Sequence, residues 1–396
     1  MKKNTSKLLC ALSLSCIVLL CACSLEKKLG KINKKIEYFE SSGQYYKAIP
    51  IAQQGLDIAL RIYTENDQRL AIYLDNMGVL YLKLGNHRLS EKYFLQSIQV
   101  WENAVGNKDP KIARTYVNIA KLYVKMNRYK AAENILLLAL SIYESENKSA
   151  NEEVADATNE LGYLYKITGK NKEALQYFNK TLKIWQESIG TDNIKLAPLY
   201  NNMGVISDIT ENNKDAERYF LKALSLRKKY LKPTDPVLAI SLTNLGNFYF
   251  KQGNNKKSLN LLIEATDIYK QAEDENNLFF ASATKTLGKI YFQKNDLQKA
   301  EVMFEHAMEI YRNLQGYNSE ENAITLENIA QLYAKRKEIE KAEITFKQAL
   351  AIKKEIFGSY HPKTLATIEK MAKFYRQVGH MGQAVKLERR LKLSKE

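Results

Sequence analysis

Small and aromatic residues recur along the chain with a fixed period of 42 residues. Counting in steps of 42 from Gly246 reaches a small residue every time, at Gly78, Ala120, Gly162, Gly204, Gly288, Ala330 and Ala372. The same count from Tyr249 reaches a tyrosine at Tyr81, Tyr123, Tyr165, Tyr291, Tyr333 and Tyr375, and fails only at Ser207. A fixed period of this length is typical of a repeat array, in which each unit buries its apolar face against its neighbours.

Each repeat predicts two amphipathic helices. The pattern is Leu-x2-Leu-Gly-x2-Tyr, then a turn, then Ala-x3-Phe, and its spacings of three and four place the apolar residues on one face of each helix. Residues 195–236 show it at Met203, Gly204, Ala216 and Phe220. The turn position holds glycine or asparagine in six repeats, with Glu211 and Lys337 as the exceptions. Because glycine and asparagine tolerate the left-handed conformation that ends a helix, the pattern predicts an all-α fold of helix pairs.

Eight such repeats occupy residues 71–396. Residues 31–70 fit the pattern weakly, because Ile36 replaces the small residue, and we interpret them as a degenerate N-terminal helix pair. Pro50 predicts a bend or a late start in the second helix of that pair. The last repeat departs from the pattern at Glu388, which predicts a polar C-terminal capping helix. The unbroken period predicts one continuous solenoid.

Residues 1–22 have the pattern of a secretory signal peptide. Met1-Lys2-Lys3 precedes an apolar run from Leu8 to Ala22, and about 15 residues are too few to span a bilayer as a permanent helix. The run ends in Leu20-Cys21-Ala22-Cys23, which resembles the lipobox of bacterial lipoproteins. The resemblance implies that Cys23 is lipidated on its sulfur and amine and that residues 23–30 form a lipid-anchored tether. A plain secretory leader with incidental cysteines is the alternative.

The residue after the cysteine and the overall charge bear on location and partners. Ser24 replaces the aspartate that retains enteric lipoproteins at the inner membrane, so the resemblance implies the periplasmic face of the outer membrane, if the cell has one. All four cysteines precede residue 24, so the folded body forms no disulfide. The net charge is +16, and removing the three lysines of the leader lowers it to +13, which favours acidic partners or an anionic membrane surface.

The repeat pattern resembles the tetratricopeptide repeat (TPR) family, in its 42-residue kinesin-light-chain-like variety, well over residues 71–393 and weakly over residues 31–70. The resemblance implies a right-handed α-solenoid of antiparallel helix pairs, the TPR superhelix, whose first helices line a concave groove. In the family, the residue two before the small position faces this groove. That position holds asparagine in five repeats, at Asn76, Asn118, Asn202, Asn244 and Asn328, and differs at Glu160, Thr286 and Lys370.

The resemblance implies that these asparagines hold the main chain of a bound peptide, as they do in kinesin light chains and Pins-type adaptors. An amide side chain offers donors and an acceptor that match a peptide backbone. Further groove-facing candidates are Asn247, Lys83, Lys121, Lys125, Lys251, Lys289, Lys335 and Lys373. Because positive residues outnumber negative ones there, we predict a protein or peptide partner with an acidic segment, whose binding weakens with salt. The alternatives are asparagines that bridge neighbouring helices and an inner face that binds nothing.

No pattern indicates catalysis. The four histidines form no metal-ligand pair, there is no phosphate-binding glycine loop, and the body contains no cysteine, so we expect no enzyme activity, cofactor or metal. We interpret the chain as a monomeric, membrane-anchored scaffold or adaptor that binds an extended segment of another envelope protein, in envelope, secretion or pilus assembly. The alternatives are a nucleic-acid-binding solenoid, disfavoured by the dispersed charge and the predicted location, and a self-assembling structural solenoid, disfavoured by the charged last helix.

Overall fold

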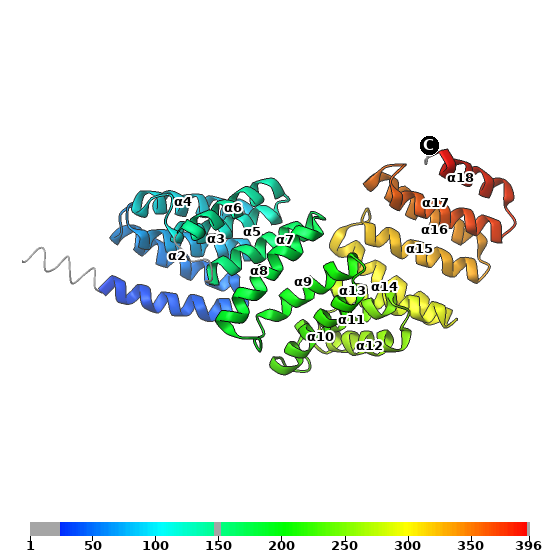
Figure 1. Cartoon of the computed structure of the whole chain (residues 1–396), viewed down its shortest axis with the longest axis horizontal. Helices are drawn as coiled ribbons and strands as arrows, with labels where there is room; N and C mark the ends of the chain where they lie inside the picture. The colour runs from blue at the N-terminus through cyan, green and yellow to red at the C-terminus, as the bar shows by residue number, and fades with distance from the viewer. Residues whose placement is uncertain (1–23, 146–151, 394–396) are drawn as a thin grey trace, which may run out of the picture. The chain divides into compact units, whose positions relative to one another are not determined.

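The computed structural model describes residues 24–145 and 152–393 (Figure 1). The secondary structure of these residues is helical, without strands, so the predicted all-α class is confirmed. The predicted signal peptide and Cys23 lie outside the described residues. Within the described ranges, no helix combines the length and the apolar character needed to cross a membrane.

The chain forms two compact units, unit 1 up to residue 191 and unit 2 from residue 192. The 42-residue period continues across the boundary between the two units. The turn before α9 lacks the Asp-Pro pair found before α11. Helix α9 begins at Leu196, two residues after the position equivalent to Pro236, and Lys195 gives it no side-chain cap.

Unit 1 contains an N-terminal helix at residues 24–41 followed by seven further helices. They are α2 (Tyr45–Ile62), α3 (Gln68–Lys83), α4 (His87–Val105), α5 (Pro110–Lys125), α6 (Tyr129–Ser145), α7 (Glu152–Ile167) and α8 (Asn171–Ile189). The pairs α3–α4, α5–α6 and α7–α8 pack closely, and the first helix α5 also contacts the first helices α3 and α7 of the neighbouring repeats. This arrangement confirms the predicted helix pairs.

Unit 2 contains five pairs, each made of consecutive helices. Its helices are α9 (Leu196–Ile209), α10 (Asn213–Tyr230), α11 (Pro236–Lys251), α12 (Asn255–Gln271), α13 (Leu278–Gln293), α14 (Leu297–Gln315), α15 (Glu320–Lys335), α16 (Ile339–Phe357), α17 (Pro362–Gln377) and α18 (Met381–Leu393). With the three pairs α3–α8, these make the eight predicted repeats. The last helix is the shortest of unit 2, and its Glu388 pairs with Arg376 at 2.6 Å.

The N-terminal pair differs from its prediction in two details. The tether predicted over residues 23–30 is helical from residue 24, because Leu29, Ile32 and Ile36 lie on one helix face and are buried. Helix α2 begins at Tyr45, and Pro50 lies inside it, so the late start is wrong. The segment predicted as a tether is therefore part of the packed body.

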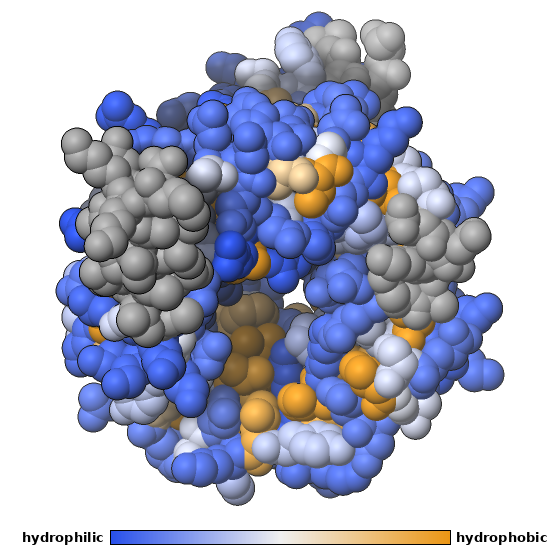
Figure 2. Space-filling model, turned by 90° about the vertical axis from the view of Figure 1, so that its left-hand side faces the viewer, coloured by the Kyte–Doolittle hydropathy of each residue, from blue (hydrophilic) through white to orange (hydrophobic). Residues whose placement is uncertain are grey.

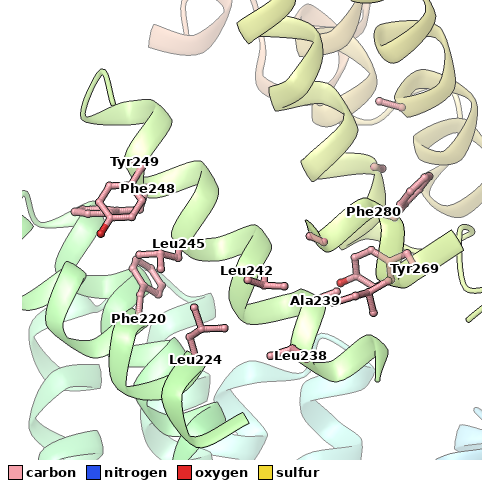
Figure 3. Close-up of a cluster of buried hydrophobic side chains, with 14 of the residues drawn as sticks. Phe220, Leu224, Leu238, Ala239, Leu242, Leu245, Phe248, Tyr249, Tyr269 and Phe280 are labelled. Carbon is pink, nitrogen blue, oxygen red and sulfur yellow. The ribbon is translucent and has the colours of Figure 1, made fainter. Parts of the chain in front are cut away.

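Glycine at the repeated small position allows two helices of one repeat to approach closely. A Cβ atom added at Gly204 would lie 2.7 Å from ring carbons of Phe220 on α10. Phe220 in turn contacts Phe248 of α11, with ring centroids 5.8 Å apart. Figure 3 shows this ring beside Leu245 in the buried cluster of α10 and α11. The small residue and the aromatic residue of the pattern thus form one packing unit.

The turns between paired helices share one backbone conformation. Glu211 and Lys337, the two exceptions to glycine or asparagine, have φ angles of 60° and 64°, close to the 57° of Asn127. Packing of the flanking helices therefore imposes the left-handed conformation even where the residue does not favour it. The Asp-Pro turns also behave as predicted, since Asp109 and Asp235 accept N-capping hydrogen bonds from Lys111 and Val237.

Candidate functional site

Unit 1 contains a pocket of about 290 Å³ that opens among its first helices, which we call the acidic pocket. It is lined by Asp75, Asn76, Val79, Arg114, Val117, Asn118, Lys121, Tyr143, Glu153 and Asp156. A second pocket, of about 460 Å³, shares Arg114, Tyr143 and Glu153 with it and adds Trp101 and Lys111. The two pockets are therefore neighbours, with Arg114, Tyr143 and Glu153 lining both.

Asp75 lies at the floor of the acidic pocket. Its side chain is almost fully buried, with the residue 3% exposed. One carboxyl oxygen, Oδ2, accepts a hydrogen bond from the hydroxyl of Thr115 at 2.7 Å, while Oδ1 has no hydrogen-bond partner among the described residues. Burial raises the pKa of the Asp75 carboxyl, and the side chains of Thr115, Ser97 and Trp101 together with the charge of Arg114 offset only part of this effect. The indole N–H of the neighbouring Trp101 is also buried and without a partner.

Unit 2 contains a pocket of about 370 Å³ with a different lining, which we call the basic pocket. It is lined by Phe292, Gln331, Ala334, Lys335, Phe346, Lys370, Lys373, Phe374 and Gln377. Three lysines and no carboxylate line this pocket. Apolar rings with ammonium groups around them suit a segment that carries carboxylates next to hydrophobic residues.

A buried ion network lies beneath the basic pocket. Glu327 of α15 is 1% exposed and accepts hydrogen bonds from Lys353 and Lys370 and from the hydroxyl of Thr367. Burial alone would raise the pKa of the Glu327 carboxyl, but these three donors hold it below its usual value. Lys370 belongs to both the network and the pocket wall. The network therefore fixes one wall of the basic pocket.

Lys289 of α13 strengthens the positive field of unit 2. Burial, together with the charges of Lys285 and Lys370, lowers the pKa of its ammonium to about 8. Among the described residues Lys289 has no ion pair, and its ammonium lies 6.0 Å from the ring of Phe250. An anion bound nearby would relieve this repulsion.

The five asparagines of the predicted ladder have different environments. Asn76 and Asn118 line the acidic pocket, and neither side-chain amide makes a hydrogen bond within the described part of the chain. Asn202 and Asn244 are partly buried, and the amide nitrogen of Asn328 is buried without a partner in the described structure. Only the first two therefore share a pocket.

Asn247 bridges two helices. Its amide nitrogen donates to the hydroxyl of Ser282 at 3.0 Å, and its carbonyl oxygen accepts from the hydroxyl of Thr286 at 2.7 Å. Both partners belong to α13, whereas Asn247 belongs to α11. The groove role predicted for Asn247 is therefore wrong, since both ends of its amide are used in packing.

Four of the predicted groove lysines are already engaged. Lys251 binds the carbonyl and carboxylate of Asp208, at 2.9 and 3.0 Å, and the equivalent Lys335 reaches the carbonyl of Phe292 at 3.4 Å. Both therefore place a positive charge at the C-terminal end of the preceding first helix, where carbonyls lack partners. The other two form ion pairs, Lys121 with Glu160 at 3.6 Å and Lys373 with Glu369 at 2.8 Å.

The remaining two candidates, Lys83 and Lys125, are exposed at the ends of α3 and α5. Of all thirteen predicted groove residues, five line the two pockets: Asn76, Asn118 and Lys121 the acidic one, and Lys335 and Lys373 the basic one. Figure 2 shows that the surface on the viewed side is mostly hydrophilic, with hydrophobic residues in small patches.

Sequence reasoning missed two features of the acidic pocket. Trp101 and Tyr143 lie 42 residues apart and are buried, as packing residues are, yet both also line the second pocket. Glu153 was missed because it lies at the start of α7, before the repeat pattern begins. A spacing of 26 residues in the sequence could have indicated these neighbours, because it separates Asp75 from Trp101 in unit 1 and Glu327 from Lys353 in unit 2. Among the described residues, no group of three potential metal-binding side chains was found.

Comparisons with known proteins agree with the repeat architecture. A family model described as "Tetratricopeptide repeat" matches residues 70–145, 153–229, 196–271, 237–313, 279–355 and 321–391. No curated protein matches the sequence. Similar solved structures include the apo form of the quorum sensor NprR from B. thuringiensis, with a TM-score of 0.69, 13% identity, and coverage of 94% of this chain and 99% of that one.

Two further structures are similar over nearly the whole chain. The apo form of RapI has a TM-score of 0.66 and 17% identity, and the match covers 94% of this chain and 97% of RapI. A Rap protein complexed with Competence and Sporulation Factor has a TM-score of 0.59 and 15% identity, and the match covers 94% and 98% of the two chains. At these identities the likeness concerns the fold.

Proposed function

Since the chain belongs to the tetratricopeptide repeat family, we propose that it is a membrane-anchored scaffold that binds an extended, acidic segment of a partner protein. The observation that carries this proposal is the basic pocket of unit 2, with Lys335, Lys370 and Lys373 around three phenylalanine rings. A Rap protein of similar fold is complexed with Competence and Sporulation Factor, which supports a binding role for such a scaffold.

The charges around the basic pocket favour a carboxylate ligand. Lys289 and Lys370 repel each other, and burial disfavours the charged form of Lys289, whose pKa is about 8. A bound carboxylate would raise this pKa, so binding takes up protons near pH 8. We therefore expect affinity to fall as the pH rises above about 8 and to fall with added salt.

The anchor is a proposal from the leader sequence. Lipidation at Cys23 would hold the helix that starts at residue 24 close to the bilayer. Anchoring raises the local concentration near membrane partners without new contacts. Replacing Cys23→Ser should move the protein from the membrane fraction to the soluble fraction, and continued membrane retention would contradict the anchor. The role in envelope, secretion or pilus assembly stays a prediction. The monomeric state and the absence of nucleic-acid binding also stay predictions.

A charge-reversal experiment tests the groove. The probe is a fluorescent, acetylated peptide of five Glu-Gly repeats, with five Gln-Gly repeats as the uncharged control, and the protein begins at residue 24. Combining Lys335→Glu with Lys373→Glu should weaken binding of the acidic peptide at least tenfold, because each lost charge contact contributes about 1 kcal/mol.

The matched control combines Lys347→Glu with Lys386→Glu. Lys347 is exposed on α16 and pairs with Glu343 at 2.6 Å, as Lys373 pairs with Glu369, but it lines neither pocket. The control should bind the acidic peptide with unchanged affinity. Equal weakening by both double variants would mean that net charge, and not the pocket, attracts the peptide.

A further inference from the structure

Two buried carboxyl groups occupy one position of the repeat, six repeats apart. Asp75 and Glu327 both lie three residues before the small position of their first helix. The residues 40 positions later are also equivalent, and in both cases a threonine hydroxyl, from Thr115 or Thr367, donates to the carboxylate. The two sites are therefore internal copies of one local structure.

The sites of Asp75 and Glu327 differ at the two positions from which lysines reach Glu327. Glu327 receives ammonium groups from Lys353, 26 residues later, and from Lys370, 43 residues later. The equivalent positions around Asp75 hold Trp101 and Asn118. No ammonium therefore reaches Asp75 from those positions, and its Oδ1 atom is without a partner in the described structure.

The acidic pocket lies where the second of these cations is missing. Lys370 is partly exposed and reaches Glu327 from the wall of the basic pocket. Its counterpart Asn118 is shorter and lines the acidic pocket together with Asp75. The volume of about 290 Å³ in unit 1 thus adjoins a buried carboxyl that has an unused acceptor.

The charge around this pocket is negative once Asp75 is ionised. Asp75, Glu153 and Asp156 face it, against the basic side chains of Arg114 and Lys121. Lys121 is already paired with Glu160, which lies outside the pocket lining, at 3.6 Å. A cation is therefore the complementary ligand, in contrast to the basic pocket of unit 2.

We propose that the acidic pocket binds a primary ammonium group of the partner segment, from a lysine side chain or a free amino terminus, with Asp75 as the carboxylate partner. This inference rests on the proposed scaffold function and adds a second recognition point to it. An ammonium group donates three hydrogen bonds. In the proposed complex the carboxylate of Asp75 accepts one, and Asn76 and Asn118, which line the same pocket, offer amide oxygens for the others.

Ammonium binding also couples to protonation. The carboxyl of Asp75 must be ionised to pair with a cation, so binding releases a proton, and affinity should rise as the pH rises through the raised pKa of Asp75. The other charged or titratable groups that face the pocket are Arg114 and Lys121 from α5, Tyr143 from α6, and Glu153 and Asp156 from α7.

The test uses small probes and the indole resonance of Trp101. The chain has two tryptophans, so its ¹H–¹⁵N spectrum has two indole signals, and Trp101→Phe assigns one of them. The probes are acetyl-lysine N-methylamide and glycine N-methylamide, with acetyl-norleucine N-methylamide as the uncharged control. We expect a saturable shift with an ammonium probe in the millimolar range and at least tenfold weaker binding of the control. The tighter of the two ammonium probes identifies the source as side chain or terminus.

Asp75→Asn is the decisive variant because it preserves shape and removes charge. Asp75→Asn should weaken binding of the ammonium probe at least tenfold. A melting temperature that is unchanged or higher would show that the variant keeps its fold. Three results would overturn the proposal. The variant could bind the ammonium probe as tightly as the original protein, the norleucine control could bind as tightly as the ammonium probe, or acetyl-aspartate N-methylamide could bind more tightly through Arg114. Lys335→Glu with Lys373→Glu should leave the ammonium probe unaffected. Failure of the ammonium probes with intact binding of the Glu-Gly peptide would therefore reject this inference alone.

Discussion

Asp75 in unit 1 and Glu327 in unit 2 show how one repeat position serves two purposes. Both carboxyls are buried to a similar degree, each at the same position of its own repeat. Their pKa values nevertheless shift in opposite directions, upward for Asp75 and downward for Glu327. The repeat therefore sets burial, whereas the residues 26 and 43 positions later set the charge state. A compensated site stabilises the fold, and an uncompensated site next to a pocket is available to a ligand.

The largest effect should come from breaking the compensated site. Lys353→Met removes an ammonium that is itself buried and leaves Glu327 with only Lys370 and Thr367. Removing one partner of a buried ion pair typically costs about 3–5 kcal/mol, and the remaining donors place this case near 3 kcal/mol. Urea unfolding measures the change. The exposed counterpart Lys347→Met should cost less than about 0.5 kcal/mol.

A loss below about 1 kcal/mol for Lys353→Met would break the comparison. It would mean that Lys370 and Thr367 compensate Glu327 by themselves. Unit 1, which has the threonine but neither lysine, would then differ from unit 2 only through the residue equivalent to Lys370.

The pH dependence of the two sites should have opposite sign. The folded-state pKa of Glu327 is lowered, so its stabilising contribution is present above the unfolded pKa and is lost as the pH falls through the folded pKa. Glu327→Gln should therefore cost about 2–3 kcal/mol at neutral pH and little at acidic pH. The measurement is the free energy of unfolding from urea titrations between pH 3 and 8.

Asp75 should behave in the reverse way. Its folded-state pKa is raised, so the folded protein binds more protons than the unfolded chain in the window between the two pKa values, and stability falls as the pH rises through it. Asp75→Asn removes this penalty and should stabilise the protein by about 1 kcal/mol at neutral pH, with no gain below the unfolded pKa. Parallel pH profiles for the two variants would contradict the difference between the sites.

The period identified the packing of this molecule but not these differences. Glycine at position 204 and phenylalanine at position 220 follow directly from the repeat, because close packing needs both. Asn247 was predicted to face the groove, yet its partners on α13 lie 35 and 39 residues away, and a rule for one helix face does not include them. The role of Asn247 depends on contacts between two repeats, and a pattern that is common to all repeats does not contain such contacts.

Restoring a cation in unit 1 should convert its site into the type found in unit 2. Asn118→Lys places an ammonium at the position equivalent to Lys370, beside Oδ1 of Asp75. We expect the pKa of Asp75 to fall below its usual value and stability at neutral pH to rise by about 1–2 kcal/mol. Carboxyl ¹³C chemical shifts against pH measure the first effect and urea unfolding the second. An unchanged pKa would show that the two positions are not equivalent in space.

The smallest effects should separate packing asparagines from groove asparagines. Asn247→Ala removes two hydrogen bonds to α13, and because Thr286 keeps a bond to the carbonyl of Ser282, the cost should be about 1 kcal/mol. Asn76→Ala removes an amide that has no partner in the described structure and lines the acidic pocket, so its cost should be below about 0.5 kcal/mol. Thermal unfolding of both variants, with the ammonium probe added in a second series, separates the two roles. If Asn76→Ala destabilises as much as Asn247→Ala and leaves probe binding unchanged, Asn76 is a packing residue as well, and the ammonium would be held by carboxylates alone.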